Sequence, residues 1–242
     1  MNYIVSCFFN TYEDPKGGGC WTPSISIMND WYKSGTHIID SGADFKLVVL
    51  YDELPQTFIQ SFDSTYVDFI KVASYISRSP YEYRWQAYSL FLEQVDKLQD
   101  SIFFTDISDV IIASNPFSNI DQNSIYLGDE QLNKFSNSWC TERLPYYREE
   151  PCDFMNIYNT YQSETFLNAG IVGGVFQQVT LFVNYMNHYL DTLPKMPDSV
   201  TDMLLFNYVA RKYFSNIVHG IPVNSVFSQQ ETSRTDVFFI HK

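Results

Sequence analysis

The sequence is poor in basic residues, and this shortage limits what the protein can bind. Its 242 residues include 15 Lys and Arg against 28 Asp and Glu, which gives a formal net charge of −13. Binding to the phosphate backbone of nucleic acid or to an anionic lipid layer requires a basic face, so neither partner is expected. A small anionic ligand would need a metal ion or a few well-placed Lys and Arg residues.

The sequence also lacks a membrane-spanning segment and a cysteine framework. No apolar run approaches the roughly 20 residues that cross a bilayer, and the N-terminal MNYIVSCFFN has no basic stretch typical of a signal peptide. Cys7, Cys20, Cys140 and Cys152 form neither a CxxC pair nor a dense disulfide pattern. We therefore expect a cytoplasmic protein with reduced thiols.

Several common catalytic motifs are missing. The sequence contains no HExxH, no GxSxG and no GxGxxG after a strand, which argues against a zinc protease, an α/β-hydrolase and a dinucleotide oxidoreductase. The glycine-rich stretch at residues 16–19, KGGG, is not a P-loop, because no GKS or GKT closes it.

What the sequence does have is an alternation of strands and helices. Hydrophobic residues make up 45% of it, enough for a sizeable core. Short β-prone stretches alternate with longer stretches of helical periodicity. The expected strands are residues 3–9, 45–51, 67–72, 101–105, 124–127, 166–174 and 237–240, and the expected helices are 23–39, 81–98, 178–193 and 200–214.

This order predicts an α/β fold: one Rossmann-like domain over residues 1–242, with a mainly parallel central sheet and helices on both faces. We expect strands 3–9, 45–51 and 101–105 to be neighbours whose carboxyl ends meet at one cleft. Residues 130–165 are polar and aromatic without clear periodicity, and they predict an irregular insertion or an acceptor-side loop.

Ligands of open α/β sheets bind beyond the carboxyl ends of strands, which directs attention to the segment SIFFTDISDVI at residues 101–111. There an apolar strand runs into Asp106 and Asp109, two carboxylates three residues apart. Hard oxygen ligands of this kind hold Mg²⁺ or Mn²⁺. The alternative is that the two Asp residues cap a turn and a following helix.

Five stretches of the sequence resemble segments of the GT-A glycosyltransferases. TDISDV followed by SNPF is similar to their strand-end DxD motif, and to the DxxD variant of the collagen-modifying galactosyl- and glucosyltransferases. YEYRWQAY resembles the preceding helix with a donor-binding Arg, and FLNAGIVGG the acceptor-side strand. SVTDMLLFN is similar to the DQ helix start of glycogenin-like enzymes, with Met203 where Gln is usual, and the final IHK resembles their late metal-binding His.

The resemblance implies a GT-A fold and a metal site. Asp106, Asp109 and His241 would bind Mn²⁺ or Mg²⁺, and Asp106 would also lie beside the donor. Arg84 and Lys242 would bind the donor phosphates. The plain alternatives are a surface Arg paired with an acid, a disordered C-terminus and a surface His.

The donor nucleoside would be bound by residues that follow the first two strands. Asn10, Thr11 and Tyr12 lie after the first strand, and Asp52 ends the second. The resemblance implies that Tyr12 lies against the base and that the polar groups contact its edge or the ribose. An ordinary turn after the strand is an equal alternative.

The transferred sugar would be bound from the acceptor-side strand and the last helix. The resemblance gives Asn168 a catalytic or sugar-binding role beside the small Ala169 and Gly170, and places Asp202 next to the reacting sugar. The alternatives are a glycine turn and a helix cap.

The expected reaction moves a hexose from a nucleoside diphosphate sugar, a UDP-sugar by resemblance, to a hydroxyl of a glycan, glycolipid or protein acceptor. The resemblance also implies retention at the anomeric carbon. Two other hypotheses stay open: a nucleotidyltransferase that uses a nucleoside triphosphate, and a non-catalytic carbohydrate-binding relative.

Overall fold

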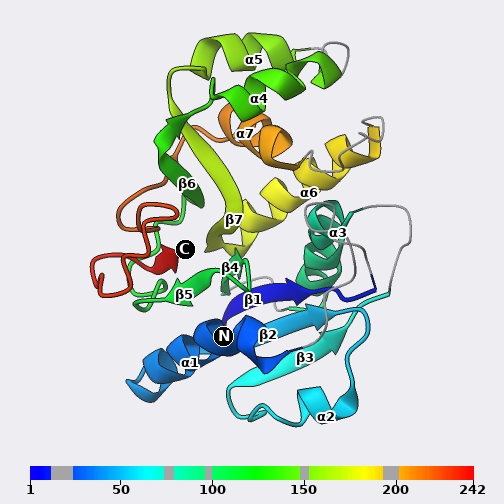
Figure 1. Ribbon diagram of the computed structural model, residues 1–242, viewed down its shortest axis with the longest axis vertical. Coiled ribbons are helices and arrows are strands. Elements are labelled where there is room, and N and C mark those ends of the chain that lie inside the picture. The colour runs from blue at the N-terminus through cyan, green and yellow to red at the C-terminus, as the bar shows by residue number, and fades with distance from the viewer. Residues whose placement is uncertain (12–23, 74–78, 96–99, 148–152, 193–201) are drawn as a thin grey trace.

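A computed structural model describes residues 1–11, 24–73, 79–95, 100–147, 153–192 and 202–242 (Figure 1). The predictions made for Tyr12, for the KGGG stretch and for Cys20 and Cys152 therefore lie outside the described residues. Both described cysteines, Cys7 and Cys140, are free thiols.

The central sheet has seven strands in the order β3-β2-β1-β4-β7-β6-β8. The first four are parallel, β7 is antiparallel to both of its neighbours, and β8 is parallel to β6. The bounds are β1 Asn2–Phe8, β2 Phe45–Tyr51, β3 Val67–Lys71, β4 Ser101–Thr105, β6 Ile125–Lys134, β7 Thr165–Val175 and β8 Ile217–Val218. The prediction of a mainly parallel sheet is confirmed.

β1 lies between β2 and β4, as predicted for these three strands. Beyond the ladder, the Ser6 hydroxyl donates to the carbonyl oxygen of Thr105 at 2.6 Å, so the carboxyl ends of β1 and β4 are held together. The Thr105 hydroxyl in turn accepts the indole N–H of Trp31 from the neighbouring helix at 2.9 Å. These contacts fix the point at which the chain leaves β4 toward Asp106.

Helices cover both faces of the sheet, because neighbouring strand residues point to opposite sides. Phe103 packs in the core formed with α1, whereas Phe104 packs in the core formed with α3, α6 and α7. This two-sided burial explains the uninterrupted apolar strand sequences. The helices are α1 Ile25–Asp40, α2 Gln56–Ile59, α3 Pro80–Leu92, α6 Phe176–Thr192 and α7 Asp202–Tyr213.

The segment 130–165 is more regular than its sequence suggests, and the expectation of an irregular insertion needs correction. β6 continues to Lys134, and the segment then forms α4 Ser138–Arg143, the 3-10 helix η1 Leu144–Tyr147 and α5 Phe154–Tyr161. In Figure 1 these helices lie at the top, beyond the end of β6. They are too short for a clear periodicity. The Asn137 cap on Cys140 (2.9 Å) and aromatic contacts within the segment, one edge-to-face and one stacked, stabilise them.

The C-terminal strand β9, Phe239–His241, does not join the central sheet. It pairs antiparallel with β5, Val110–Ile112, in a separate two-stranded sheet where Val110 lies opposite His241. A strand therefore follows Asp109, not the helix that the capping alternative required. None of the described helices is long and apolar enough to cross a membrane.

Gly173 provides a test of the β4–β7 register. It lies directly opposite Phe103, and a Cβ added there would be 2.1 Å from Cδ1 of the Phe103 ring. We expect Gly173→Ala to lower the free energy of unfolding by about 1–3 kcal/mol, because the ring must leave its rotamer. Leu132→Ala, at a side chain that is 73% exposed, should stay within about 0.5 kcal/mol. Equal urea midpoints for the two variants would contradict this packing.

Candidate active site

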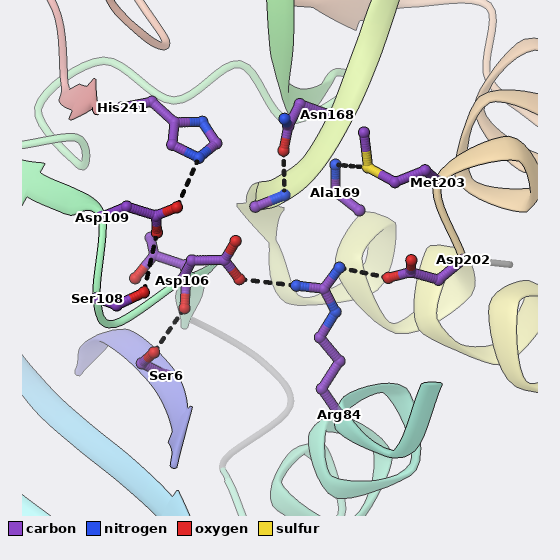
Figure 2. A network of polar contacts seen from close by, with 12 residues as sticks. Ser6, Arg84, Asp106, Ser108, Asp109, Asn168, Ala169, Asp202, Met203 and His241 are labelled. Carbon is purple, nitrogen blue, oxygen red and sulfur yellow. Dashed lines mark hydrogen bonds and ion pairs between the residues drawn. The ribbon is translucent and has the colours of Figure 1, made fainter. Parts of the chain in front are cut away.

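Two carboxylates and an imidazole meet beyond the end of β4. Ligand atoms of Asp106, Asp109 and His241 all lie within 4.8 Å of one another (Figure 2). The backbone N–H of Asp106 donates to the carbonyl of Gly170 at 2.8 Å, which extends the β4–β7 pairing by one residue. The structure thus brings together the three residues that the sequence analysis named as metal ligands.

Backbone pairing, not side-chain attraction, brings His241 to this place. The β5–β9 register sets it opposite Val110, and the N–H of Lys242 donates to the carbonyl of Asp109 at 2.8 Å. The N–H of His241 donates to the Ser225 hydroxyl at 3.0 Å. The end of the described chain is therefore fixed beside the acidic turn.

The environment of His241 keeps its imidazole neutral. The residue is 1% exposed, and burial lowers its pKa to about 4. Its Nδ1 is buried without a hydrogen-bond partner among the described residues, and its Nε2 lies 3.8 Å from Oδ2 of Asp109. A neutral imidazole with an available lone pair is the form that binds a metal.

Gly170 keeps the space between these side chains open. A Cβ added there would lie 2.6 Å from Cε1 of His241 and 2.8 Å from Oδ2 of Asp106. Two carboxylates and one imidazole around such a space fit Mn²⁺ or Mg²⁺, since both ions take oxygen ligands and Mn²⁺ also accepts nitrogen.

Arg84 is the cation of the site, and it is 6% exposed. Its Nη1 donates to Oδ1 of Asp106 at 2.7 Å, and its Nη2 donates to Oδ2 of Asp202. Burial alone would lower the pKa of Arg84, but the charges of Asp202 and Asp106 outweigh burial and raise it. α3 thus supplies a permanent positive charge between two carboxylates (Figure 2).

Asp202 is the first residue of α7, where the helix dipole favours a carboxylate. Asn207, one turn and a half later, fixes that end of the helix on β7. Its amide bonds both the N–H (2.9 Å) and the carbonyl (2.8 Å) of Leu167, and donates to the carbonyl of Met203 at 2.9 Å. The sequence analysis missed Asn207, whose only signal was a polar residue in an otherwise apolar helix stretch.

Asn168 is held within the protein by both ends of its amide. Oδ1 accepts the N–H of Gly170 at 2.7 Å, and Nδ2 donates to Glu130 at 2.9 Å. The N–H of Ala169 donates to the Met203 sulfur at 3.2 Å. Glu130 is a second residue that sequence reasoning missed, because a Glu within an expected loop carries no signal of its own.

The residues predicted to bind the nucleoside are placed differently from the expectation. Asp52 accepts the backbone N–H groups of Asn10 and Thr11, each at 3.0 Å, and also the Thr11 hydroxyl. Its carboxylate therefore holds the loop after β1. Asn10 lines a shallow pocket with residues including Lys71, and this pocket does not include Asp106. Among the described residues, Asn10 and Asp106 therefore line different pockets.

Lys242 also points away from the cluster. Its ammonium group pairs with the carboxylate of Asp30 on α1. In this structure its backbone, not its side chain, contributes to the site.

Two cavities meet at Tyr81, Arg84, Asp106 and Asp109. The β1 pocket, of about 170 Å³, lies at the carboxyl ends of β1 and β4 and includes Ser6 and Thr105 among its lining residues. The β7 pocket, of about 430 Å³, extends to β7, α4 and the start of α7. The acidic cluster and Arg84 therefore lie at the junction of two binding spaces.

The fold is shared with solved glycosyltransferases. The galactosyltransferase LgtC in complex with donor and acceptor sugar analogs is similar with a TM-score of 0.51 and 12% identity, over 100% of this chain and 86% of that one. An active-site mutant of LgtC gives 0.51 and 13%, over 100% and 86%. The apo bifunctional glycosyltransferase WbbM gives 0.58 and 15%, over 98% of this chain and 45% of that one.

At these identities the similarity establishes the fold, which is the GT-A Rossmann-like fold that the sequence predicted. The chain spans less than half of the WbbM chain. No family model matches the sequence, and no curated protein matches it.

The buried ion-pair network predicts a large and non-additive cost when it is broken. Arg84→Met would leave the carboxylate of Asp202, which is 1% exposed, without its partner, and should cost about 3–5 kcal/mol of unfolding free energy. Asp202→Asn combined with Arg84→Met should cost less than the sum of the single changes, by about 0.5–3 kcal/mol. Chemical denaturation of the four proteins measures both quantities.

Arg234 offers a matched control, since it also pairs with two acids, Glu231 and Asp236, but at the surface. Arg234→Met should cost much less than Arg84→Met, because exposed pairs are screened by water. Additive losses at Arg84 and Asp202, or equal losses at Arg84 and Arg234, would contradict the proposed network.

Proposed function

We propose that the protein is a metal-dependent glycosyltransferase that moves a hexose from a UDP-sugar to an acceptor hydroxyl. One observation carries this proposal: Asp106, Asp109 and His241 form a cation-sized cluster at the junction of two pockets. It is supported by the GT-A fold, which the chain shares with LgtC and WbbM.

The charge balance of the junction favours a divalent cation. Arg84 pairs with Asp106 and Asp202, and Asp109 adds a third carboxylate close to Asp106, so this region keeps an excess of negative charge. A diphosphate placed there would be repelled by about 4 kcal/mol for each pair of charges 4 Å apart at an effective dielectric constant of about 20. When bound by the three-residue cluster, Mn²⁺ or Mg²⁺ would supply the positive charge that neutralises the departing diphosphate.

We assign different parts of the UDP-sugar to the two pockets. The β1 pocket lies beyond the strand ends where α/β sheets bind nucleotides, so we assign the nucleoside to it. The diphosphate lies at the junction, and the hexose extends into the β7 pocket beside Asp202 and Asn168. Asn10, Thr11 and Tyr12 remain the proposed nucleoside contacts, and Asp52 holds the first two of them in place.

In the transfer, the acceptor oxygen bonds to the anomeric carbon of the hexose, the bond from that carbon to the β-phosphate oxygen breaks, and the acceptor proton passes to the leaving diphosphate. Arg84 would favour this step because its charge stays close to the developing negative charge. Asp202 would stabilise positive charge on the sugar ring, while Asn168 and Glu130 shape the space beneath it. Lys242 would contact phosphate only after leaving Asp30, so we assign this role to Arg84.

We further infer that the anomeric configuration is retained, an inference supported by the resemblance to glycogenin-like enzymes alone. The nucleotidyltransferase alternative has no support among the described residues, since Arg84 is the only cation that lines either junction pocket there. A comparison of UDP-hexose and nucleoside triphosphate turnover separates the two hypotheses.

The metal site predicts that UDP-hexose binds only with Mn²⁺ or Mg²⁺. Asp109→Asn should weaken UDP-hexose affinity in Mn²⁺ by more than about 100-fold, the upper end of the losses seen for residues that merely support metal ligands. His241→Ala should weaken Mn²⁺ binding more than Mg²⁺ binding, because imidazole suits the softer ion. Calorimetric titration in each metal and in EDTA measures these affinities.

Asp44→Asn is the matched control for this experiment. Asp44 is an exposed carboxylate just before β2, and it lines neither junction pocket. Its affinity should stay close to that of the unmodified protein. Tight UDP-hexose binding in EDTA that Asp109→Asn leaves unchanged would refute the metal site and return the Asp pair to a structural role.

A further inference from the structure

The far end of the β7 pocket has a chemistry different from that of the junction. Its lining there comes from the end of β6, from α4 with the residue before it, and from β7, and consists of Glu130, Asn133, Asn137, Ser138, Trp139 and Phe166. We name this group the α4 subsite. We propose that it binds a pyranose ring of a saccharide acceptor, a proposal that rests on the glycosyltransferase function proposed above and specifies its acceptor class.

The polar groups of the α4 subsite suit sugar hydroxyls. The side-chain amide N–H of Asn133 donates to the Glu130 carboxylate at 2.8 Å, and the side-chain carbonyl oxygen of Asn133 remains as an acceptor. The side-chain carbonyl oxygen of Asn137 caps α4 at the N–H of Cys140 (2.9 Å), and one amide N–H bonds to the Cys140 thiol, so the second amide N–H is left as a donor. With the exposed hydroxyl of Ser138, these groups offer neutral donors and acceptors side by side, as a polyol requires.

Charge argues against an anionic acceptor. The subsite itself includes one carboxylate, Glu130, and no Lys or Arg among its described lining residues. A phosphate or carboxylate would be repelled there, whereas a neutral hydroxyl can donate to Glu130. The Glu130 carboxylate also accepts from Asn168 at 2.9 Å, so it connects the subsite to the acceptor-side strand.

Trp139 provides a fixed aromatic surface in the same place. The Arg143 guanidinium lies 4.2 Å from the centre of the indole, and its Nη1 donates to the Trp139 carbonyl at 3.1 Å. Phe166 of β7 packs against the indole with ring centres 6.1 Å apart. A half-buried indole held in this way can pack against the C–H face of a pyranose at little cost in side-chain entropy.

The size and position of the pocket favour a saccharide over a folded protein surface. The β7 pocket encloses about 430 Å³, within the range of roughly 300–1,000 Å³ of pockets that bind small molecules. It is continuous with Gly170, Asp202 and Asp106, so a ring in the α4 subsite would present a hydroxyl to the transferred sugar. This location distinguishes an acceptor subsite from a remote carbohydrate-binding surface.

The test is direct binding of neutral disaccharides to the full chain, independent of turnover. Maltose, cellobiose, lactose and chitobiose are titrated by calorimetry and ligand-observed NMR, with and without UDP and Mn²⁺. We expect at least one to bind, and Trp139→Ala to weaken it about tenfold or more, the usual loss for a central aromatic contact. Trp139→Phe should recover part of the affinity.

Tyr146→Ala is the matched control. Tyr146 is an aromatic residue of η1, adjoining α4, that is 44% exposed and lines neither junction pocket. It should leave disaccharide affinity unchanged. If Trp139→Ala does not fold, the exposed Asn133→Ala provides the second variant, and it should weaken the same disaccharide about threefold or more through the lost hydrogen bond.

Failure of this proposal and failure of the proposed function give different results. UDP-hexose hydrolysis by water tests the donor half alone, and the control Tyr146→Ala should leave its rate unchanged. Hydrolysis without binding of any of the four disaccharides, or binding that survives both Trp139→Ala and Asn133→Ala, would overturn the saccharide subsite only. Disaccharide binding lost in Trp139→Ala, without any UDP-hexose turnover, would support the subsite and contradict the transferase.

Discussion

One buried guanidinium connects the three elements that build the site. Arg84 of α3 donates to Asp106 beyond the end of β4 and to Asp202 at the start of α7. In a chain with a net charge of −13, this cation makes it possible to bury Asp202 beside a second carboxylate. Its position also fixes which oxygens of the acidic turn remain for other ligands, because Oδ1 of Asp106 is engaged while Oδ2 faces Gly170 and His241.

The remaining geometry follows from backbone pairing around that ion-pair network. The β4–β7 pairing sets Gly170 against the acidic turn, and the β5–β9 pairing sets His241 across from it. Asn207 bonds α7 to Leu167 of β7, and Asp202 at the start of this helix lines the same pocket as Asn168 of that strand. The result is a junction between the β1 pocket, of about 170 Å³, and the β7 pocket, of about 430 Å³. Charged groups lie at its centre, and the α4 end is lined by neutral polar and aromatic groups and one carboxylate, Glu130.

The sequence predicted those parts of the structure that depend on local pattern. Strands 45–51 and 101–105 have the predicted bounds, because an apolar run buried on both faces has few alternatives. The polar second half of β6 and the short α4 and α5 escaped prediction, since pairing with β7 and aromatic packing stabilise them. The sequence predicted Asp106, Asp109 and His241 as a cluster, but it did not predict the contacts of Asp52, Lys242 and Asn207. Each of these three residues bonds to a partner at least 40 residues away, which for Lys242 is Asp30 of α1, and sequence spacing does not reveal such partners.

The proposed function requires that Asp106, Asp109 and His241, and no other group of residues, bind the cation that neutralises the charge of the diphosphate. The most direct measurement is anomalous diffraction at the manganese edge from crystals grown with UDP and Mn²⁺. The account predicts one strong peak bonded to carboxylate oxygens of Asp106 and Asp109, to a ring nitrogen of His241 and to the diphosphate. UDP bound at the junction without a peak, or with a peak held by other residues, would contradict it.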